Sequence, residues 1–315
     1  MSGKKLREIN KEKERRKRKV KDCQLIATLP AMNNISKIID IFSNPYISEV
    51  RYNTGGLSPY NPEVTIQKLK ELAEKYNKKL WIDLKGRQLR VAKWADPKYE
   101  CITLNHKIKV TPPATILLRN GEGCNITHII NGNQVYVDPL PRHAVGAGQS
   151  VNIIASDLKI DGYLTIKDME YLEICNKLGV NNFMASFVED FNDIADILKM
   201  APNANIVLKI ESKKGMELVN SYIPGASLMA ARDDLYIQTG LDMMKHLKTI
   251  IEKDKNAICA SRIFMSLEHN DTPDFCDYED LEYMYSLGYR RFMLCDNVCN
   301  YAFDRAIGAW KRWNI

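Results

Sequence analysis

The chain has 315 residues, of which 45% are hydrophobic and 27% are charged, so it has the composition of a globular protein and the length for a large core. No apolar run approaches the roughly 20 residues that a membrane-spanning helix needs, and no apolar stretch follows the charged start of the chain, which argues against a membrane span and a secretory signal. The eight cysteines show no CxxC pair and no zinc-type spacing, and we therefore expect reduced thiols in a cytoplasmic protein.

The net charge of +6 is concentrated at the start of the chain. Residues 1–22 hold eleven Lys and Arg against four Asp and Glu, a balance of +7, so the remaining residues sum to −1. Such a segment is either a solvated, partly helical extension or an arm that binds nucleic acid or another anionic surface. Because no aromatic residue is interleaved with these charges, we favour the extension, and nucleic acid stays the less favoured partner.

Short apolar runs alternate with helix-patterned segments along the chain. Continuous apolar strands of this kind are typical of a parallel sheet covered by helices, and eight of them favour a closed (β/α)8 barrel over an open sheet. Helices are expected over 35–41, 64–76, 165–178 and 190–200, among others. The predicted strands are residues 23–30, 47–53, 79–86, 181–187, 204–211, 226–232, 256–262 and 290–296.

Residues 92–151 break this alternation, because they contain short strand-like runs and turn signals but no convincing helix. Hairpin turns are expected at Gly121 to Gly123 and at Asn131 and Gly132. The predicted organisation is therefore a basic extension over 1–22, a barrel over 23–91 and 152–315, and a small all-β domain over 92–151. Since barrel active sites lie at the C-terminal ends of the strands, a domain inserted after the third strand is placed to act as a lid.

Charged and polar residues gather where five of the predicted strands end, and a barrel brings these ends to one mouth. Glu211 and Asp234, from neighbouring strands, offer the carboxylate oxygens that a hard divalent ion such as Mg²⁺ or Mn²⁺ prefers. The surrounding cations suit an anionic substrate bound to that metal. The strand-end residues are Arg51, Asn53, Asp83, Lys85, Arg87, Arg90, Lys209, Glu211, Arg232, Asp233, Asp234, Ser261 and Arg262.

The order of motifs resembles the pyruvate kinase family. That family has a TIGP-like first strand, an R-x-N-x-S-H second strand and a third strand close to LDTKGPEIR, and this chain has ATLPA, RYNTGG and IDLKGRQLR in their places. After the lid region, VNI, LTIKD, MASF, KIES, MAARDDLY and CASR resemble the family's VNLPG, LTEKD, FASF, KIEN, MVARGDLG and CATQ. The resemblance runs from about residue 23 to residue 310, and it implies a barrel with a β lid and a glycolytic reaction in the cytoplasm.

The resemblance implies catalytic and metal-binding roles for five matching residues. Glu211 and Asp234 match the carboxylates that bind Mg²⁺. Lys209 matches the lysine that stabilises charge on the transferring phosphoryl group and on the enolate. Arg51 matches the arginine that faces the substrate phosphate, and Ser261 replaces a threonine but keeps a hydroxyl near the substrate carbon.

The resemblance also implies cofactor-binding residues, and here the chain departs from the family. Asn53 and Asp83 match ligands of a monovalent cation, and Arg90, which ends the third motif, is counted with them as cofactor-binding. The family's serine ligand of that cation is Gly55 here, which makes K⁺ a doubtful cofactor. The family's nucleotide-associated histidine is Gly56.

Asp233 is the departure of most consequence. The family has a glycine there, and the backbone N–H groups at this helix start meet the substrate phosphate. Because two like charges roughly 4 Å apart cost several kcal/mol, Asp233 is expected to point away, to ligate the metal or to weaken phosphate binding. Arg87 and Gln88 replace a proline and a glutamate of the third motif, and LCDNVC stands where the family has LSGETA. No counterpart of the family's C-terminal regulatory domain is expected within these residues.

The sequence therefore predicts a Mg²⁺-dependent phosphoryl transfer of the pyruvate kinase type between phosphoenolpyruvate and a nucleoside diphosphate such as ADP, giving pyruvate. Three alternatives stay open at this point. One is a lyase or decarboxylase that acts on a 2-oxo acid through an enolate, another is a kinase for a different substrate, and the third is an inactive relative that serves as a binding module. The oligomeric state is left open.

Overall fold

The computed structural model describes residues 21–56, 58–118, 121–221 and 226–314. The predicted basic extension over 1–22 therefore lies outside the described residues, apart from its last two positions. Within the described part of the chain, no helix has both the length and the apolar character that crossing a membrane requires.

Eight parallel strands form a closed barrel, in which β15 pairs back to β1. Going round the barrel, the order is β1, β2, β3, β11, β12, β13, β14 and β15. Their bounds are Gln24–Thr28, Ile47–Asn53, Lys79–Leu84, Asn182–Ala185, Asn205–Ile210, Ser227–Ala231, Ile258–Ala260 and Arg291–Leu294. Every one of these strands falls within a predicted strand, so the structure confirms the (β/α)8 barrel.

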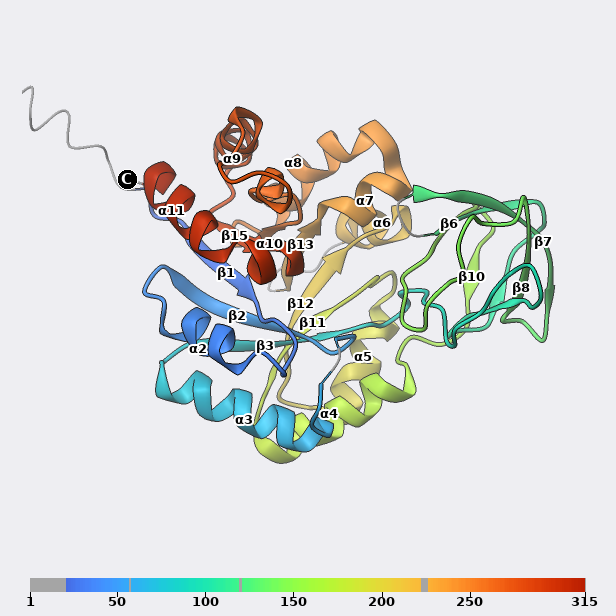
Figure 1. Ribbon diagram of the computed structural model, residues 1–315, viewed down its shortest axis with the longest axis horizontal. Helices are drawn as coiled ribbons and strands as arrows, with labels where there is room; N and C mark the ends of the chain where they lie inside the picture. The colour runs from blue at the N-terminus through green and yellow to red at the C-terminus, as the bar shows by residue number, and fades with distance from the viewer. Residues whose placement is uncertain (1–20, 57, 119–120, 222–225, 315) are drawn as a thin grey trace, which may run out of the picture.

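Helices surround the barrel, as Figure 1 shows. The sequence sets several of their starts: Asn61 caps α3 just before Pro62, and Thr165 forms a capping box with Asp168 at the start of α4. The helices are α2 Ile35–Ser43, α3 Pro62–Lys75, α4 Ile166–Leu178, α5 Phe191–Met200, α6 Lys213–Asn220, α7 Arg232–Thr239, α8 Met243–Lys253, α9 Phe275–Leu287, α10 Asp296–Tyr301 and α11 Phe303–Asn314. Short 3₁₀ turns cover Gly240–Asp242 and Met265–Glu268.

The inside of the barrel has its own apolar core, separate from the core between strands and helices. It consists of Ile26, Trp81, Met184, Val207, Met229, Ile258, Ala260 and Met293. Side chains alternate along a strand, so Asp83 shares the inward face of Trp81, and Lys209 shares the inward face of Val207. The barrel therefore presents charged side chains directly above an apolar plug.

An antiparallel unit stands to one side of the barrel (Figure 1). Five strands pair in the order β4-β8-β7-β6-β9, and β10 pairs with β5. The bounds are β4 Ile102–Thr103, β5 Ile108–Lys109, β6 Ala114–Leu117, β7 Gly123–Ile130, β8 Gln134–Asp138, β9 Asn152–Ile154 and β10 Lys159–Ile160. This confirms the all-β lid after the third barrel strand, and the pairings of β9 and β10 continue the unit past residue 151.

The lid turns follow from residues that accept a left-handed backbone. Asn131 and Gly132, between β7 and β8, have φ angles of 55° and 81°, which suits a tight hairpin turn. Gly121, between β6 and β7, has a φ of 74°. Both predicted hairpin turns are therefore present.

Asp168 joins the two chain segments that flank the lid. Its carboxylate accepts hydrogen bonds from the backbone N–H groups of Lys85 (2.7 Å) and Gly86 (3.1 Å), just after β3, while it also caps α4 through Thr165. The side chain is fully buried. One carboxylate thus fixes where the chain leaves the barrel and where it returns.

We predict that Asp168→Ala lowers the free energy of unfolding by about 3 kcal/mol, because it removes a helix cap and leaves two buried N–H donors without a partner. Asp190→Ala is the control, since Asp190 is the exposed N-cap residue of α5 and makes no contact with the turn after β3, and its loss costs about 1 kcal/mol. Urea unfolding measures both. Equal losses for the two variants would contradict this role of Asp168.

Candidate active site

One cavity of about 220 Å³ at the C-terminal ends of the barrel strands gathers all eight predicted site residues. Because side chains alternate along a strand, the site residues on β2, β3 and β12 point into the barrel. Further site residues come just after β12, β13 and β14. The eight are Arg51, Asn53, Asp83, Arg90, Lys209, Glu211, Asp234 and Ser261. Their proximity is a structural finding, whereas their individual roles stay predictions.

The fully buried carboxylate of Asp83 lies at the centre of the charged residues. Arg51 donates to it through Nε (3.0 Å) and Nη2, Lys209 Nζ lies 3.2 Å from Oδ1, and Lys85 Nζ lies 3.4 Å from Oδ2. Although burial opposes ionisation, these three cations hold the pKa of Asp83 well below its usual value. Asp83 is therefore a permanent anion that draws three cations to the barrel mouth.

Lys209 and Glu211 form a buried pair on the same inward face. Lys209 Nζ lies 3.3 Å from Glu211 Oε1 and donates to Ser186 Oγ at 2.7 Å. Although burial alone would lower it, the pKa of Lys209 is raised by Asp83 and Glu211, so the lysine is charged. Burial raises the pKa of Glu211 to about 7, with a contribution from Asp234, even though Lys209 acts in the opposite direction. Glu211 is thus an under-neutralised carboxylate.

Asp234 faces the same cavity from the first turn of α7. Its Oδ1 accepts a hydrogen bond of 3.2 Å from Asn152 at the start of β9, so the lid touches this carboxylate directly. Burial raises the pKa of Asp234 as well. Among the described residues no group of three or more His, Cys, Asp or Glu is arranged to hold a metal ion. Two desolvated carboxylates, Glu211 and Asp234, are what the protein itself offers a hard cation.

Asp233 lines the same cavity as Asp234 and bonds to Arg262. Its Oδ1 accepts a hydrogen bond of 2.7 Å from Arg262 Nε, and both side chains are about half exposed. A cation from the neighbouring strand end therefore neutralises the charge of Asp233, although its side chain still lines the cavity. Arg262 also stacks near the ring of Tyr236, at 5.6 Å from its centroid.

Arg232 does not line the cavity, and its contacts give it a structural role instead. Its guanidinium is buried, forms two hydrogen bonds with Asp280 (2.6 and 2.8 Å), and donates to the carbonyl oxygens of Ala260 and Ser261. Ser261 has a φ of 67° and Arg262 one of 63°, a left-handed conformation that is costly for non-glycine residues. Arg232 therefore holds the backbone that presents Ser261 to the cavity.

Sequence reasoning did not single out three residues that contact the predicted ones. Asp296, at the start of α10, lies 3.3 Å from Arg51 Nη1 and accepts a hydrogen bond of 3.4 Å from Asn53. Ser186 and Asn152 touch Lys209 and Asp234, as described above. The available signal was weak, since MASF, VNI and LCDNVC mark these segments without saying which side chain turns inward.

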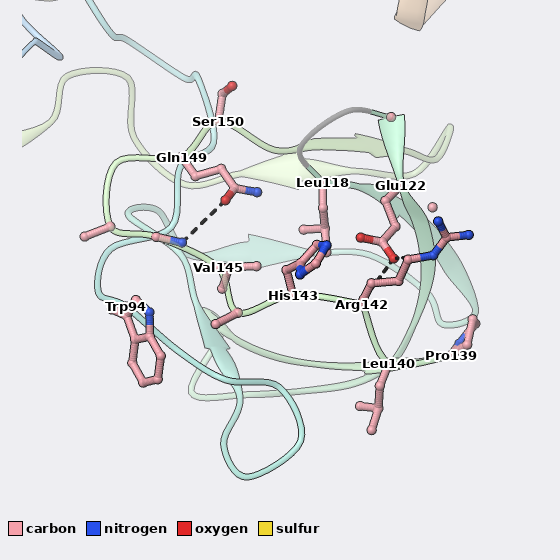
Figure 2. A pocket seen from close by; sticks show the side chains of 15 residues that line it. Trp94, Leu118, Glu122, Pro139, Leu140, Arg142, His143, Val145, Gln149 and Ser150 are labelled. Atoms are coloured by element: carbon pink, nitrogen blue, oxygen red, sulfur yellow. Dashed lines mark hydrogen bonds and ion pairs between the residues drawn. The ribbon is translucent and has the colours of Figure 1, made fainter.

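A larger hollow of about 1250 Å³ lies on the lid, and none of the eight predicted site residues lines it. Figure 2 shows its lining, in which Arg142 is turned toward Glu122, and these side chains approach to 3.9 Å. Trp94 and Leu140 lie along it and are both exposed. The charged side chains with perturbed pKa values described above lie in the barrel cavity and not in this hollow.

Comparisons with known proteins agree with the geometry. The family model described as pyruvate kinase, barrel domain, matches residues 109–295. A pyruvate kinase of Lactobacillus delbrueckii subsp. bulgaricus is 28% identical over 148 residues, covering 44% of this chain and 25% of that protein. Pyruvate kinase 2 of Saccharomyces cerevisiae is 24% identical over 237 residues, covering 64% of this chain and 47% of that protein. The matches thus span half or less of the relatives' length. With the barrel, the lid and the gathered strand-end residues, this places the chain in the pyruvate kinase family.

Proposed function

We propose that the protein transfers a phosphoryl group between phosphoenolpyruvate and a nucleoside diphosphate, giving pyruvate and a nucleoside triphosphate. The observation that carries this proposal is Lys209, a buried ammonium held by Asp83, Glu211 and Ser186 and facing the cavity. A cation fixed in a desolvated site stabilises charge that develops during the reaction, without any reorganisation.

In the proposed reaction the bond between phosphorus and the enol oxygen breaks, and a bond from phosphorus to a β-phosphate oxygen of the diphosphate forms. Lys209 and Arg51 neutralise negative charge on the transferring group and on the enolate oxygen. The enolate carbon then takes a proton from water, and we assign a place near that carbon to the hydroxyl of Ser261, which lines the cavity. Phosphoryl transfer needs such positioning more than it needs a covalent partner.

The predicted Mg²⁺ (or Mn²⁺) site fits the donor set of the chain. Glu211 and Asp234 are desolvated carboxylates that face one cavity, and burial raises the pKa of both. The charge of Asp234 adds to the raised pKa of Glu211, so a cation between them relieves an existing repulsion. Mg²⁺ takes few ligands from protein and the rest from substrate and water, and when bound it would neutralise phosphate and enolate charge.

We also propose a cytoplasmic location. All eight cysteines are free, and burial raises the pKa of those at Cys175 and Cys259, to about 12 and about 11, so these thiols stay protonated. Unpaired thiols are the usual state in a reducing compartment.

We predict that the protein forms pyruvate from phosphoenolpyruvate and ADP when Mg²⁺ is present, and that Lys209→Ala lowers kcat by roughly 10²–10³-fold because it removes the buried cation. A coupled assay that follows pyruvate measures this. Lys199→Ala is the control, since Lys199 is an exposed lysine that pairs with Asp196 on α5, outside the cavity.

Phosphotransfer would be refuted if the unaltered protein forms pyruvate no faster than Lys209→Ala does. Exchange of the methyl protons of pyruvate in deuterated water, dependent on both Mg²⁺ and Lys209, would then point to enolate chemistry without phosphate. Loss of that exchange as well would point to a binding module.

We predict that Mg²⁺ binds about tenfold more weakly at pH 6 than at pH 8. Burial raises the pKa of Glu211 from 4.5 to about 7, so between these values the folded protein holds a proton that the unfolded chain has released. In the metal-free protein, the raised pKa of Glu211 contributes stability that is fully present below pH 4.5 and is lost as the pH rises through 7. Below pH 7, Mg²⁺ must displace the proton from Glu211 in order to bind, which weakens its affinity.

Calorimetric Mg²⁺ titrations at the two pH values test this dependence. Glu211→Gln is the matched variant, because it keeps the shape of the side chain and removes the titrating group. Equal Mg²⁺ affinities at pH 6 and pH 8 for the unaltered protein would contradict a proton on Glu211.

We predict that Arg262→Met raises the KM for phosphoenolpyruvate roughly fivefold, because it leaves the charge of Asp233 without a partner at the start of α7. The double variant Asp233→Ala with Arg262→Met restores KM to near its starting value, since no unpaired charge remains. Steady-state kinetics on the two variants provide the measurement. A double variant as impaired as Arg262→Met would mean that Arg262 acts on the substrate itself.

A further inference from the structure

The side chain of Lys85 ends between Asn53 and Asp83. Lys85 Nζ donates a hydrogen bond to Asn53 Oδ1 and lies 3.4 Å from Asp83 Oδ2. The side chain is almost completely buried, at 6% exposed. Asn53 and Asp83 are the two residues that the family resemblance assigns to a monovalent cation. In this chain the point where their oxygens converge is therefore taken by an ammonium group.

Gly55 makes room for this ammonium. A Cβ atom at Gly55 would lie 2.9 Å from Lys85 Cε and 3.2 Å from Asn53 Oδ1, and the first of these is closer than real Cβ atoms come to other atoms. A serine at this position, as the resembled motif has, and Lys85 in its present place exclude each other. The resembled motif also has a lysine at the position of Lys85, so the change in this chain is the missing hydroxyl, and the Lys85 ammonium takes the space that it leaves.

The backbone of Lys85 is fixed, so its side chain starts from a defined place. Asp168 accepts the N–H groups of Lys85 and Gly86. Gly86 has a φ of 49°, and a Cβ there would lie 2.4 Å from the carbonyl oxygen of Ser186, so no other residue fits. The side chain leaves this anchored turn and reaches Asn53 from beneath the exposed Gly55.

Charge balance also argues against an additional monovalent cation. Asp83 is in contact with Arg51, Lys85 and Lys209, and Arg90 adds a further positive charge nearby. Asp296 lies opposite, paired with Arg51 and Asn53. A free ion at this point would meet a buried ammonium within contact distance, and like charges in such a poorly screened site repel strongly.

We infer that the Lys85 ammonium serves as a built-in monovalent cation, held by Asn53 and Asp83 in the space left by Gly55, and that the protein needs no K⁺. The residues present do not fit a bound K⁺ beside Lys85. The inference goes beyond the proposed phosphotransfer, because it concerns which cation lies between Asn53 and Asp83, whatever reaction the site catalyses.

The test compares thermal unfolding of the ligand-free protein in potassium chloride and in tetramethylammonium chloride at equal ionic strength. The unaltered protein is expected to unfold at the same temperature, within about 1 °C, in both salts. Lys85→Met removes the ammonium and keeps a chain of similar length, which opens the space between Asn53 and Asp83. Its unfolding temperature is expected to rise by roughly 2–4 °C in K⁺ relative to tetramethylammonium.

Gly55→Ser is the second variant, and it provides an independent test if Lys85→Met does not fold. Its Cβ displaces the flexible end of Lys85 and its hydroxyl restores a third oxygen ligand, so it is expected to gain the same K⁺-specific rise. Lys199→Met, a change at an exposed lysine, is the control and is expected to respond like the unaltered protein.

A K⁺-specific rise in the unaltered protein overturns the inference, and so does the lack of a K⁺ response in the folded variants of Lys85 and Gly55. The readout contains no substrate and no turnover. Failure of the phosphotransfer assay and failure of this inference are therefore separate results.

Discussion

The buried carboxylate of Asp83 is the constraint on which the barrel mouth depends. A fully desolvated anion is tolerated only when charged partners surround it, and Arg51, Lys85 and Lys209 do so from three directions. The inward face of β3 and the anchored turn after it set the place of Asp83, and Asp83 in turn sets where the three cations stand. The predicted catalytic lysine is thus positioned by a network of charges rather than by packing alone.

The departures from the family pattern are accompanied by compensating partners. Asp233 adds a negative charge at the start of α7, and Arg262 neutralises it. Gly55 removes a hydroxyl, and Lys85 fills the space with an ammonium. Asp296 adds a carboxylate at the start of α10, and Arg51 and Asn53 bind it. These pairs keep the charges of the mouth balanced, as their burial requires whatever reaction takes place there.

The sequence allowed the barrel strands to be predicted, because continuous apolar runs mark buried parallel strands. Chemistry gathers at their C-terminal ends, and the resemblance to the pyruvate kinase motifs selected the eight site residues among the strand-end residues. The sequence could not give the direction of Asp233, whose carboxylate turns to a residue on another strand. It also could not assign Asp296 or Asn152 to the mouth, because α10 and β9 reach it only through the closure of the barrel and the placement of the lid. Strand periodicity is local, whereas these contacts depend on register between distant segments.

A crystal structure with Mg²⁺, K⁺ and oxalate, a mimic of the pyruvate enolate, tests the account most directly. The account predicts Mg²⁺ between Glu211 and Asp234, oxalate beside Lys209, and the Lys85 ammonium still on Asn53 and Asp83 with no K⁺ there. Mg²⁺ bound elsewhere, or K⁺ between Asn53 and Asp83 with Lys85 displaced, would contradict it.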